Sequence, residues 1–241
     1  MSINTSGWNE SDAEQYAALG GQDHVPILCE ALTELVDLHG RRVLDFGCGE
    51  GHLTRALIER AKPATMLGID TSEALIQTAR GVAPDDGSIQ FRVGDEAALP
   101  LDEPVDVALC SLMLMMCRTK AQLARTLRGL AGSVRPGGSI VIALTHPCFR
   151  RADYGTFHNQ LPEAFDYWQS GCDYDVQLAA DDEDRSAAIR DTHWTLSDYL
   201  NAIVEAGGVI DRVDEQPISF DESGQPIGRP AFLLIRAIAG D

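Results

Sequence analysis

The chain has 241 residues, of which 44% are apolar, so it can bury the core of one α/β domain or at most of two small ones. Its 37 acidic and 19 basic side chains give a formal net charge of −18, and no basic stripe interrupts them. A surface this negative repels phosphate groups, which argues against nucleic acid and anionic membranes as partners.

The sequence carries no pattern typical of export or membrane insertion. Residues 1–21 are polar and acidic, without the basic and then apolar layout of a signal peptide. The longest apolar run, 107–117, is broken by Ser111 and is too short to span a bilayer. The six cysteines include no C-x-x-C pair, so we interpret them as reduced core thiols and expect neither disulfides nor a metal site. We therefore expect a soluble, cytoplasmic protein.

Helical and strand-like apolar patterns alternate along the first 145 residues. Residues 135–138 are expected to form a turn, and Thr119 with Gln122 a capping box at the start of a helix. The predicted helices are 27–36, 52–60, 72–80 and 119–130, and the predicted strands are 43–46, 65–70, 89–93, 105–110 and 139–145. Most of these strands are apolar throughout, which predicts a mostly parallel sheet with helices on both faces.

The composition of the chain and its pattern of apolar residues change after Pro147. Nine of the fifteen aromatic residues lie within 149–199, where we find no alternating periodicity and expect an insertion that caps the sheet. The acidic run 181–184 is interpreted as the solvated start of a helix through Ile189. Thr195 and Asp198 then predict a capping box and a helix to 206. Two last strands, 209–214 and 231–238, are predicted to pair in antiparallel fashion, because the loop between them has no room for a helix.

These patterns predict a single domain over residues 1–241. Its expected parts are an N-terminal lid with helices (1–40), a ligand-binding core (41–146), the aromatic cap (147–194) and a closing helix with the strand pair (195–241).

A glycine loop directly follows the first predicted strand. Gly47, Gly49 and Gly51 stand at alternate positions before a predicted helix, so a ligand can lie against bare backbone at the helix start. Dinucleotide-binding loops have G-x-G-x-x-G, whereas His52 occupies the place of their third glycine. Asp45 also precedes the loop, where it would repel a pyrophosphate but attract an amino group. The loop therefore favours a nucleoside ligand without phosphates over NAD.

Two further carboxylates are expected at the same edge of the sheet. Asp70 ends the second predicted strand, 23 residues after Gly47, where a carboxylate can accept hydrogen bonds from both ribose hydroxyls. Asp95 follows the third strand and suits the exocyclic amine of adenine. With Asp45, these acids predict a site for a cationic nucleoside.

Five motifs in this order resemble the class I S-adenosylmethionine-dependent methyltransferases, of the small-molecule type, over about residues 40–145. They are Val-Leu-Asp-Phe-Gly-Cys-Gly-Glu-Gly (43–51), Gly-Ile-Asp (68–70), Gly-Asp (94–95), Val-Asp-Val-Ala-Leu-Cys-Ser (105–111) and Arg-Pro-Gly-Gly (135–138). The resemblance implies an α/β fold with a Rossmann-like seven-stranded sheet, mostly parallel with an antiparallel last strand, and S-adenosylmethionine as cofactor.

The resemblance also implies the residues that meet the cofactor. Asp45, Gly47 and Gly49 would contact the methionine end, Asp70 the ribose, and Asp95 with Glu96 the adenine. Tyr16 is expected to close a lid, and Cys48 is interpreted as a small filler of the loop, not a nucleophile. The full predicted set is Tyr16, Asp45, Gly47, Cys48, Gly49, Asp70, Thr71, Asp95, Glu96, Cys110 and Ser111.

Three side chains are candidates for a general base, where the acceptor must lose a proton. His146 follows the fifth strand at the carboxyl edge of the sheet, and His193 lies at the return from the cap. Tyr154 is a third candidate. The alternative for the histidines is a local structural role. The methionines at 113, 115 and 116 pack in the core or line the substrate pocket.

The aromatic cap predicts a small, rather apolar acceptor, with an aromatic or heteroaromatic metabolite as one option, methylated on O, N or C. Three alternatives stay open: a tRNA- or protein-modifying methyltransferase, a non-catalytic protein that binds S-adenosylmethionine, and an NAD-dependent oxidoreductase. The net charge of −18 argues against RNA. We leave self-association as a homodimer open.

Overall fold

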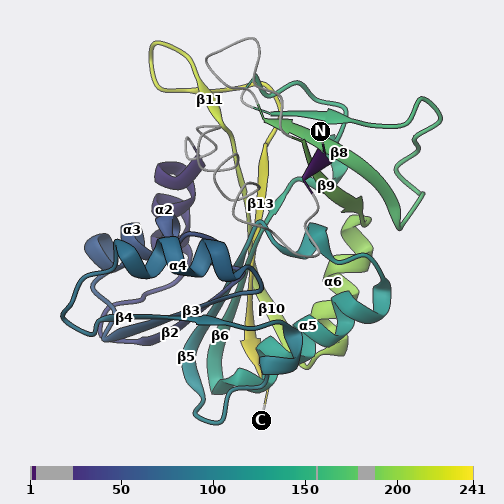
Figure 1. Cartoon of the computed structure of the whole chain (residues 1–241). Helices are drawn as coiled ribbons and strands as arrows, with labels where there is room; N and C mark the ends of the chain where they lie inside the picture. The colour runs from purple at the N-terminus through teal and green to yellow at the C-terminus, as the bar shows by residue number, and fades with distance from the viewer. Residues whose placement is uncertain (1, 4–23, 156, 179–187, 241) are drawn as a thin grey trace.

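A seven-stranded sheet forms the centre of the molecule, with helices on both faces (Figure 1). The computed structural model describes residues 2–3, 24–155, 157–178 and 188–240. In spatial order the strands are β10 (Gly208–Gln216), β13 (Phe232–Ala239), β6 (Val134–Thr145), β5 (Val105–Ser111), β2 (Arg42–Phe46), β3 (Thr65–Asp70) and β4 (Ile89–Val93).

The direction of the strands confirms the predicted topology. β6, β5, β2, β3 and β4 run parallel to one another, so their carboxyl ends meet at one edge. β13 is antiparallel to both of its neighbours, β6 and β10. The sheet is therefore the expected Rossmann-like, mostly parallel sheet with an antiparallel strand near one side.

The helices divide between the two faces of the sheet. α2 (His24–Leu35), α3 (His52–Ala61) and α4 (Glu73–Gly81) cover one face, and α5 (Lys120–Ser133) and α6 (Leu196–Glu205) cover the other (Figure 1). The Thr195 side chain accepts a hydrogen bond from the backbone of Asp198, and the Asp198 side chain accepts one in return, which confirms the predicted capping box. Thr119 caps α5 as expected, but the Gln122 side chain accepts from the backbone of Arg118 instead.

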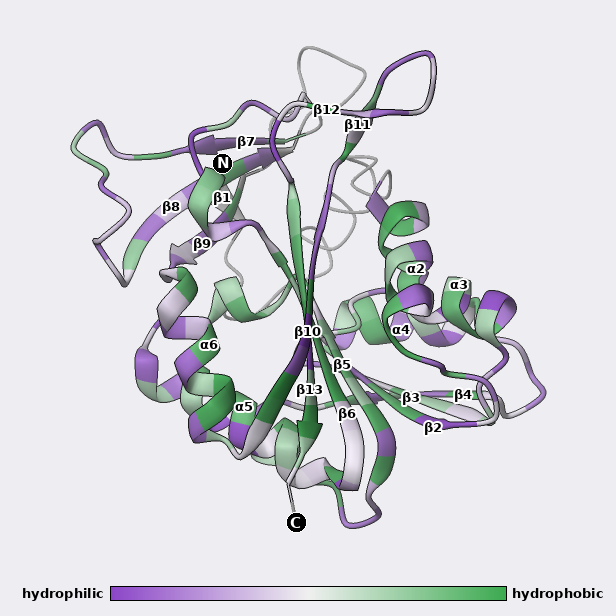
Figure 2. Cartoon of the chain, turned by 180° about the vertical axis from the view of Figure 1, so that it is seen from behind, coloured by the Kyte–Doolittle hydropathy of each residue, from purple (hydrophilic) through white to green (hydrophobic). Residues whose placement is uncertain are grey.

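Both faces of the sheet bury apolar side chains, which explains why its strands are apolar throughout. Along β2, Val43 belongs to the cluster beneath α2 and α3, whereas Leu44 and Phe46 belong to the cluster beneath α5 and α6. Figure 2 shows the same concentration of apolar residues along the central strands. Two large cores, one on each face, thus hold the sheet edge in place.

The cap contains strands that the sequence analysis did not predict. β7 (Phe157–Gln160), β8 (Cys172–Leu178) and β9 (Ala188–His193) form an antiparallel sheet, which β1 (Ser2–Ile3) joins alongside β9. The expected absence of periodicity was wrong, because in β8 apolar residues alternate with Asp173, Asp175 and Gln177. The helix expected through Ile189 was also wrong, since Ile189 lies in β9.

The predicted turn at residues 135–138 is part of β6. The pairing of β5 with β6 shifts from Val105–Val134 to Val107–Ser139, so residues 135–138 bulge between the two pairs. A small hairpin of β11 (Ser219–Phe220) and β12 (Pro226–Ile227) occupies the loop between β10 and β13. Tyr16 and the acidic run 181–184 lie outside the described residues.

No helix in the described part of the chain is long and apolar enough to cross a membrane.

Candidate functional site

The glycine loop turns sharply at the carboxyl end of β2. The backbone N–H groups of Gly47 and Cys48 both donate to the carbonyl oxygen of Ile69, at 2.7 and 3.1 Å, which holds the loop against β3. Gly49 has a φ of +55°, and a Cβ placed on it would meet no atom within 4 Å. The peptide at Gly49 therefore faces open space, where a ligand can lie against it.

Asp45 is buried below this loop. Its carboxylate accepts a hydrogen bond of 2.6 Å from Thr54 Oγ1 on α3, and only 2% of the residue is exposed. Burial raises the pKa of Asp45 to about 6, against the opposing effect of the Thr54 hydrogen bond, and the charge of Asp70 adds to the increase.

Asp70 connects the end of β3 to the glycine loop. One carboxylate oxygen accepts from the N–H of Gly49 and the other from the N–H of Ser72, each at 2.9 Å. Burial raises the pKa of Asp70, while these backbone hydrogen bonds lower it. The orientation of the carboxylate is thus fixed by the chain itself.

Asp95 and Glu96 stand at the end of β4. Asp95 accepts from the N–H of Ala97 at 2.9 Å and so caps the short helix η1 (Glu96–Ala98). Glu96 lies 3.2 Å from the guanidinium of Arg125 on α5. Both carboxylates are held at the same edge of the sheet as Asp45 and Asp70.

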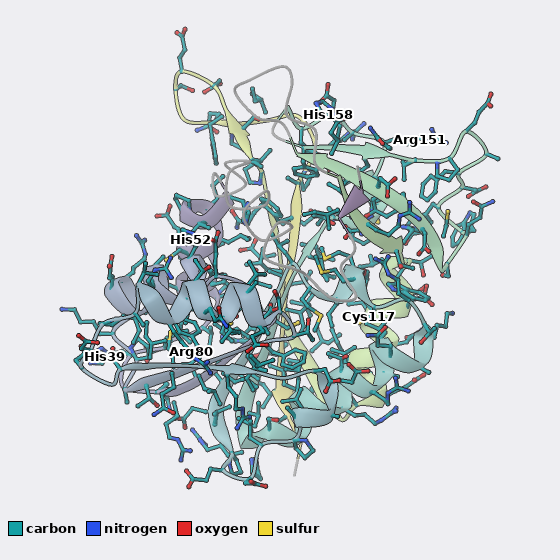
Figure 3. The ribbon with its side chains drawn as sticks, in the orientation of Figure 1. His39, His52, Arg80, Cys117, Arg151 and His158 are labelled. Atoms are coloured by element: carbon teal, nitrogen blue, oxygen red, sulfur yellow. The ribbon has the colours of Figure 1, made fainter. Side chains whose placement is uncertain are left out.

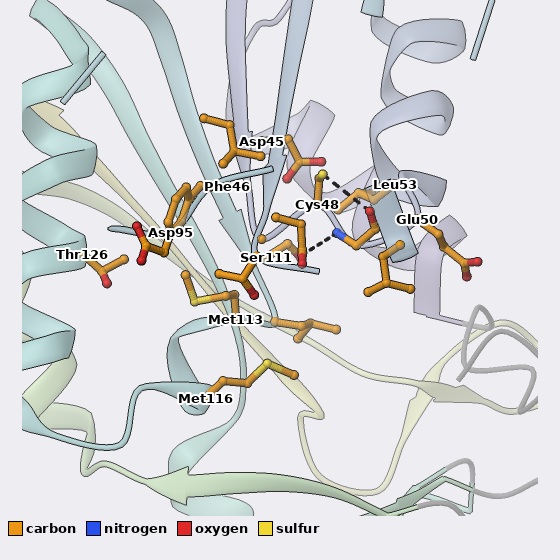
Figure 4. A pocket seen from close by; sticks show the side chains of 18 of the residues that line it. Asp45, Phe46, Cys48, Glu50, Leu53, Asp95, Ser111, Met113, Met116 and Thr126 are labelled. Atoms are coloured by element: carbon orange, nitrogen blue, oxygen red, sulfur yellow. Dashed lines mark hydrogen bonds between the residues drawn. The ribbon is translucent and has the colours of Figure 1, made fainter. Parts of the chain in front are cut away.

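These elements enclose a cavity of about 460 Å³. Figure 4 shows Asp45, Asp95, Ser111 and Met113 around it. The three carboxylates that the sequence analysis expected to meet do line one space, and the volume lies in the usual range of ligand pockets. Of the predicted cofactor-contacting residues, the cavity is lined by Asp45, Gly47, Cys48, Gly49, Asp70, Thr71, Asp95, Glu96 and Ser111.

Cys110 is the one residue of the predicted set within the described part of the chain that does not line the cavity, since it is buried in β5. Burial raises the pKa of Cys48 and of Cys110 above the ordinary thiol value, so both are protonated thiols at neutral pH.

Met113, directly before the short helix η2 (Leu114–Met116), and Met116, at its end, also line the cavity, which is one of the two roles that the sequence left open for them. Gln122 and Thr126, which project from α5, were not found from the sequence. A signal for the last two existed, because they stand one turn apart at the start of the helix that follows the fourth parallel strand. Met115 is buried instead.

The two candidate histidines differ in their free hydrogen-bonding capacity. His146 accepts from the N–H of Cys148 at Nδ1, and its Nε2 lies 2.7 Å from a carboxylate oxygen of Glu215. His193 places Nε2 2.7 Å from the carbonyl oxygen of Tyr167, and its buried Nδ1 has no partner among the described residues. A carbonyl only accepts, so Nε2 of His193 carries the proton and Nδ1 carries a lone pair.

The surroundings of all three base candidates are buried. Burial lowers the pKa of both His146 and His193, which keeps the imidazoles neutral at neutral pH. Tyr154 donates to the carbonyl oxygen of Pro230 at 2.9 Å, and burial raises its pKa to about 12. None of the three lines the cavity.

Comparison with protein families gives one match that covers the cavity-forming region. Residues 43–138, from β2 into β6, match the model of a methyltransferase domain. This stretch contains the glycine loop and the carboxylates at the ends of β2, β3 and β4.

Two curated relatives match part of the chain. Trans-aconitate 2-methyltransferase of Methylobacterium nodulans is 31% identical over 133 residues, which cover 55% of this chain and 49% of the relative. Ubiquinone biosynthesis O-methyltransferase of Stutzerimonas stutzeri is 29% identical over 156 residues, which cover 64% and 60%. This chain thus spans only about half to three fifths of the length of these relatives.

One solved structure matches almost the entire chain. An S-adenosylmethionine-dependent methyltransferase from Mesorhizobium loti aligns with a TM-score of 0.64 and 26% identity, over 91% of this chain and 99% of the other. The resemblance therefore extends from the cavity-forming region to the cap.

Proposed function

We propose that this chain, which belongs to the class I S-adenosylmethionine-dependent methyltransferases, transfers a methyl group to a small acceptor molecule. The observation that carries the proposal is the cavity at the carboxyl edge, in which Asp45, Asp70 and Asp95 converge beside the open backbone of Gly49. Carboxylates around bare peptide groups suit a ligand that has an amino group, ribose hydroxyls and a sulfonium, but no phosphate.

The residues that line the cavity fit S-adenosylmethionine, the cofactor of the family. We assign Asp45 and the loop at Gly47 and Gly49 to its methionine part, Asp70 to the ribose, and Asp95 with Glu96 to the adenine. Ser111 supports this fit, because its buried Oγ has no hydrogen-bond partner among the described residues and is free to meet a ligand atom.

Bound S-adenosylmethionine supplies a methyl group that is already activated for displacement. The residues of the chain must then mainly hold the acceptor in line with that group, an orientation effect worth up to ~7–11 kcal/mol. The role that we propose for the cap is to exclude water from the reacting groups.

A proton must also leave where the acceptor is a hydroxyl or an amine. His193 is the first candidate for this base, because the lone pair on its Nδ1 is unused and its imidazole is neutral. His146 is the second, although both of its ring nitrogens already have partners. Tyr154 is the third, and its raised pKa makes it the weakest.

The proposed acceptor is a small, rather apolar metabolite, methylated on O, N or C. The relatives named after trans-aconitate and ubiquinone biosynthesis make oxygen the first atom to test. The alternatives are methylation of tRNA or protein, which the charge of −18 disfavours for RNA, and binding of the cofactor without catalysis. A homodimer stays a proposal that size-exclusion chromatography can test.

Two experiments test the proposal. Calorimetric titration with S-adenosylhomocysteine should give saturable heat, whereas NAD should give none. Incubation of the protein with radiolabelled S-adenosylmethionine and a cell extract should then place label in the small-molecule fraction. Absence of heat with S-adenosylhomocysteine would refute the cofactor assignment. Heat without labelled product would favour the non-catalytic alternative, and label in RNA or protein would favour the modifying enzymes.

A further inference from the structure

A second polar region lies between the cap and the sheet, apart from the residues assigned to the cofactor. Arg150, directly after the short helix η3 (Pro147–Phe149), is only 2% exposed. Around it stand Tyr174 on β8, Asp191 and His193 on β9, and Tyr199 on α6, all of them buried. We call these five residues the Arg150 cluster.

The Arg150 cluster has more unused hydrogen-bonding groups than any other part of the described chain. Seven buried side-chain nitrogen and oxygen atoms of the described residues lack a hydrogen-bond partner. Four of the seven belong to this cluster: Nε and Nη2 of Arg150, Nδ1 of His193 and the hydroxyl of Tyr199. Since buried polar groups are nearly always paired, such a concentration indicates a site for a ligand.

The two unpartnered nitrogens of Arg150 have a specific geometry. Nη1 donates to Thr145 Oγ1 at the end of β6, which leaves Nε and Nη2 free. These two nitrogens share one edge of the planar guanidinium and direct parallel N–H bonds to the same side. A carboxylate accepts such a pair of hydrogen bonds with both of its oxygens.

Charge points to the same class of ligand. A buried guanidinium is costly unless an anion compensates it. Asp191, the one acid of the cluster, instead accepts from the hydroxyl of Tyr174 at 3.4 Å. Burial raises the pKa of Asp191 to about 6, although Arg150 and Arg118 oppose this increase. The side chain of Tyr174 covers Arg150, whose Cζ lies 5.4 Å from the ring centre.

The Arg150 cluster also adjoins the cavity. Cys117 lines the cavity and accepts a hydrogen bond of 3.0 Å from the indole of Trp194, the residue after His193. Cys117, which is labelled in Figure 3, and Tyr199 belong to the same cluster of buried apolar residues. One small acceptor could thus reach from the cluster to the cavity.

We propose that the Arg150 cluster binds a carboxylate group of the methyl acceptor, so that the acceptor is a small organic acid. This inference rests on the proposed function and adds the class of acceptor to it. Nε and Nη2 of Arg150 donate to the two carboxylate oxygens, and the Tyr199 hydroxyl donates a third hydrogen bond.

The test measures binding, not turnover. The protein is saturated with S-adenosylhomocysteine and titrated calorimetrically with acetate, succinate and benzoate, each paired with its neutral amide, and with inorganic phosphate. At least one carboxylate should bind at least about tenfold more tightly than its amide and than phosphate, since hydrogen bonds to charged groups are the stronger ones. Preference for no carboxylate, or equal binding of phosphate, would overturn the inference.

Variants then assign the binding to Arg150. Arg150→Gln should lower the affinity for the carboxylate about tenfold to a hundredfold. The affinity for S-adenosylhomocysteine should stay unchanged. Arg151→Gln is the matched control, because Arg151 is the adjacent, exposed arginine at the periphery of the cap (Figure 3). Equal carboxylate binding by Arg150→Gln and Arg151→Gln would contradict the inference.

Two further variants cover a failure of Arg150→Gln to fold. Arg150→Lys keeps the charge but loses the paired N–H geometry, and Tyr199→Phe removes only the hydroxyl. Each variant should therefore lower the affinity for the carboxylate about threefold to tenfold. Unchanged carboxylate affinity in both would refute the inference. A protein that fails to bind S-adenosylhomocysteine refutes the proposed function itself, so the two failures can be distinguished.

Discussion

The cofactor cavity and the Arg150 cluster are two polar regions of opposite character. In the cavity, Asp45 and Asp70 accept hydrogen bonds from Thr54, Gly49 and Ser72, so the chain itself orients their carboxylates. In the cluster, by contrast, the guanidinium of Arg150 and its neighbours keep donors and acceptors without partners. The fold thus preorganises the cavity, whereas the proposed carboxylate ligand would complete the Arg150 cluster.

The largest expected effect concerns His193, which belongs to the Arg150 cluster. His193→Gln keeps a donor for the carbonyl of Tyr167 but loses the lone pair at Nδ1. Once an acceptor is known, its turnover should fall by about 10²- to 10⁴-fold, the usual contribution of a general base. The affinity for S-adenosylhomocysteine, measured by calorimetry, should not change.

His146→Gln is the comparison variant, because both ring nitrogens of His146 are already paired. A small effect there with a large one at His193 would agree with the proposed order of bases. Full turnover in both variants would exclude a histidine as general base. Orientation of the acceptor would then be the only proposed contribution to the rate enhancement.

The second effect concerns Asp70, in the preorganised region. Asp70→Ala removes the proposed ribose acceptor and leaves the N–H groups of Gly49 and Ser72 without their partner. The affinity for S-adenosylhomocysteine should fall about a hundredfold, because each lost hydrogen bond to a charged group costs about 1.5–3 kcal/mol. Asp102→Ala, at an exposed acid away from the cavity, should bind normally in the same titration.

The third effect is a dependence of protein stability on pH, to which both regions contribute. Burial raises the pKa of Asp45 and of Asp191 to about 6, so the folded protein holds these protons more tightly than the unfolded chain. The free energy of unfolding should therefore decrease as the pH rises from about 4 to about 6, by up to roughly 3 kcal/mol for each group.

Chemical denaturation of Asp45→Asn and Asp191→Asn across this range checks the prediction. Each substitution should flatten the pH dependence of stability. Because we assign Asp45 to the amino-bearing methionine part of the ligand, loss of its proton should raise the affinity for S-adenosylhomocysteine above pH 6. Only Asp45→Asn should remove this increase, since Asp45 lines the cavity and Asp191 does not. Loss of that increase in Asp191→Asn would mean that the two regions do not act separately.

The smallest effect concerns the open space beside Gly49. Gly49→Ala and Gly40→Ala place a Cβ at φ values of +55° and +65°, with no atom within 4 Å of either. Both variants should therefore lose about 1–2 kcal/mol of stability in thermal denaturation, the cost of a left-handed residue. Only Gly49→Ala should lower the affinity for S-adenosylhomocysteine, by about threefold to tenfold, because the added methyl group enters the cavity. Equal affinities would show that the ligand does not lie against Gly49.

The sequence predicted the preorganised region better than the cluster. The ends of parallel strands meet at one edge, so Asp45, Asp70 and Asp95 could be brought together from strand positions alone. Gln122 and Thr126 could not, because their contribution depends on how α5 packs against that edge. The strands of the sheet were also predictable, because each contains a short apolar run that the sequence shows directly.

The cap shows where local patterns were missed and where they do not suffice. The alternation in β8 was present in the sequence but hidden by neighbouring aromatic and acidic residues. Nothing local distinguishes Arg150 from Arg151, because two adjacent arginines look alike until the fold buries one of them. Only the packing of β8, β9 and α6 around Arg150 does so.

The position of β13 has a consequence for how the protein is made. β13 lies between β6 and β10, yet both neighbours leave the ribosome before it does. Until β13 is synthesised, β10 has no partner strand in the main sheet. The edge of β6 that pairs with β13 also stays without hydrogen-bond partners until then. Because pairing across such a sequence separation is slow, we expect the closing of this gap to be the late step of folding. A chain truncated before Phe232 would then expose two unpaired strand edges and aggregate.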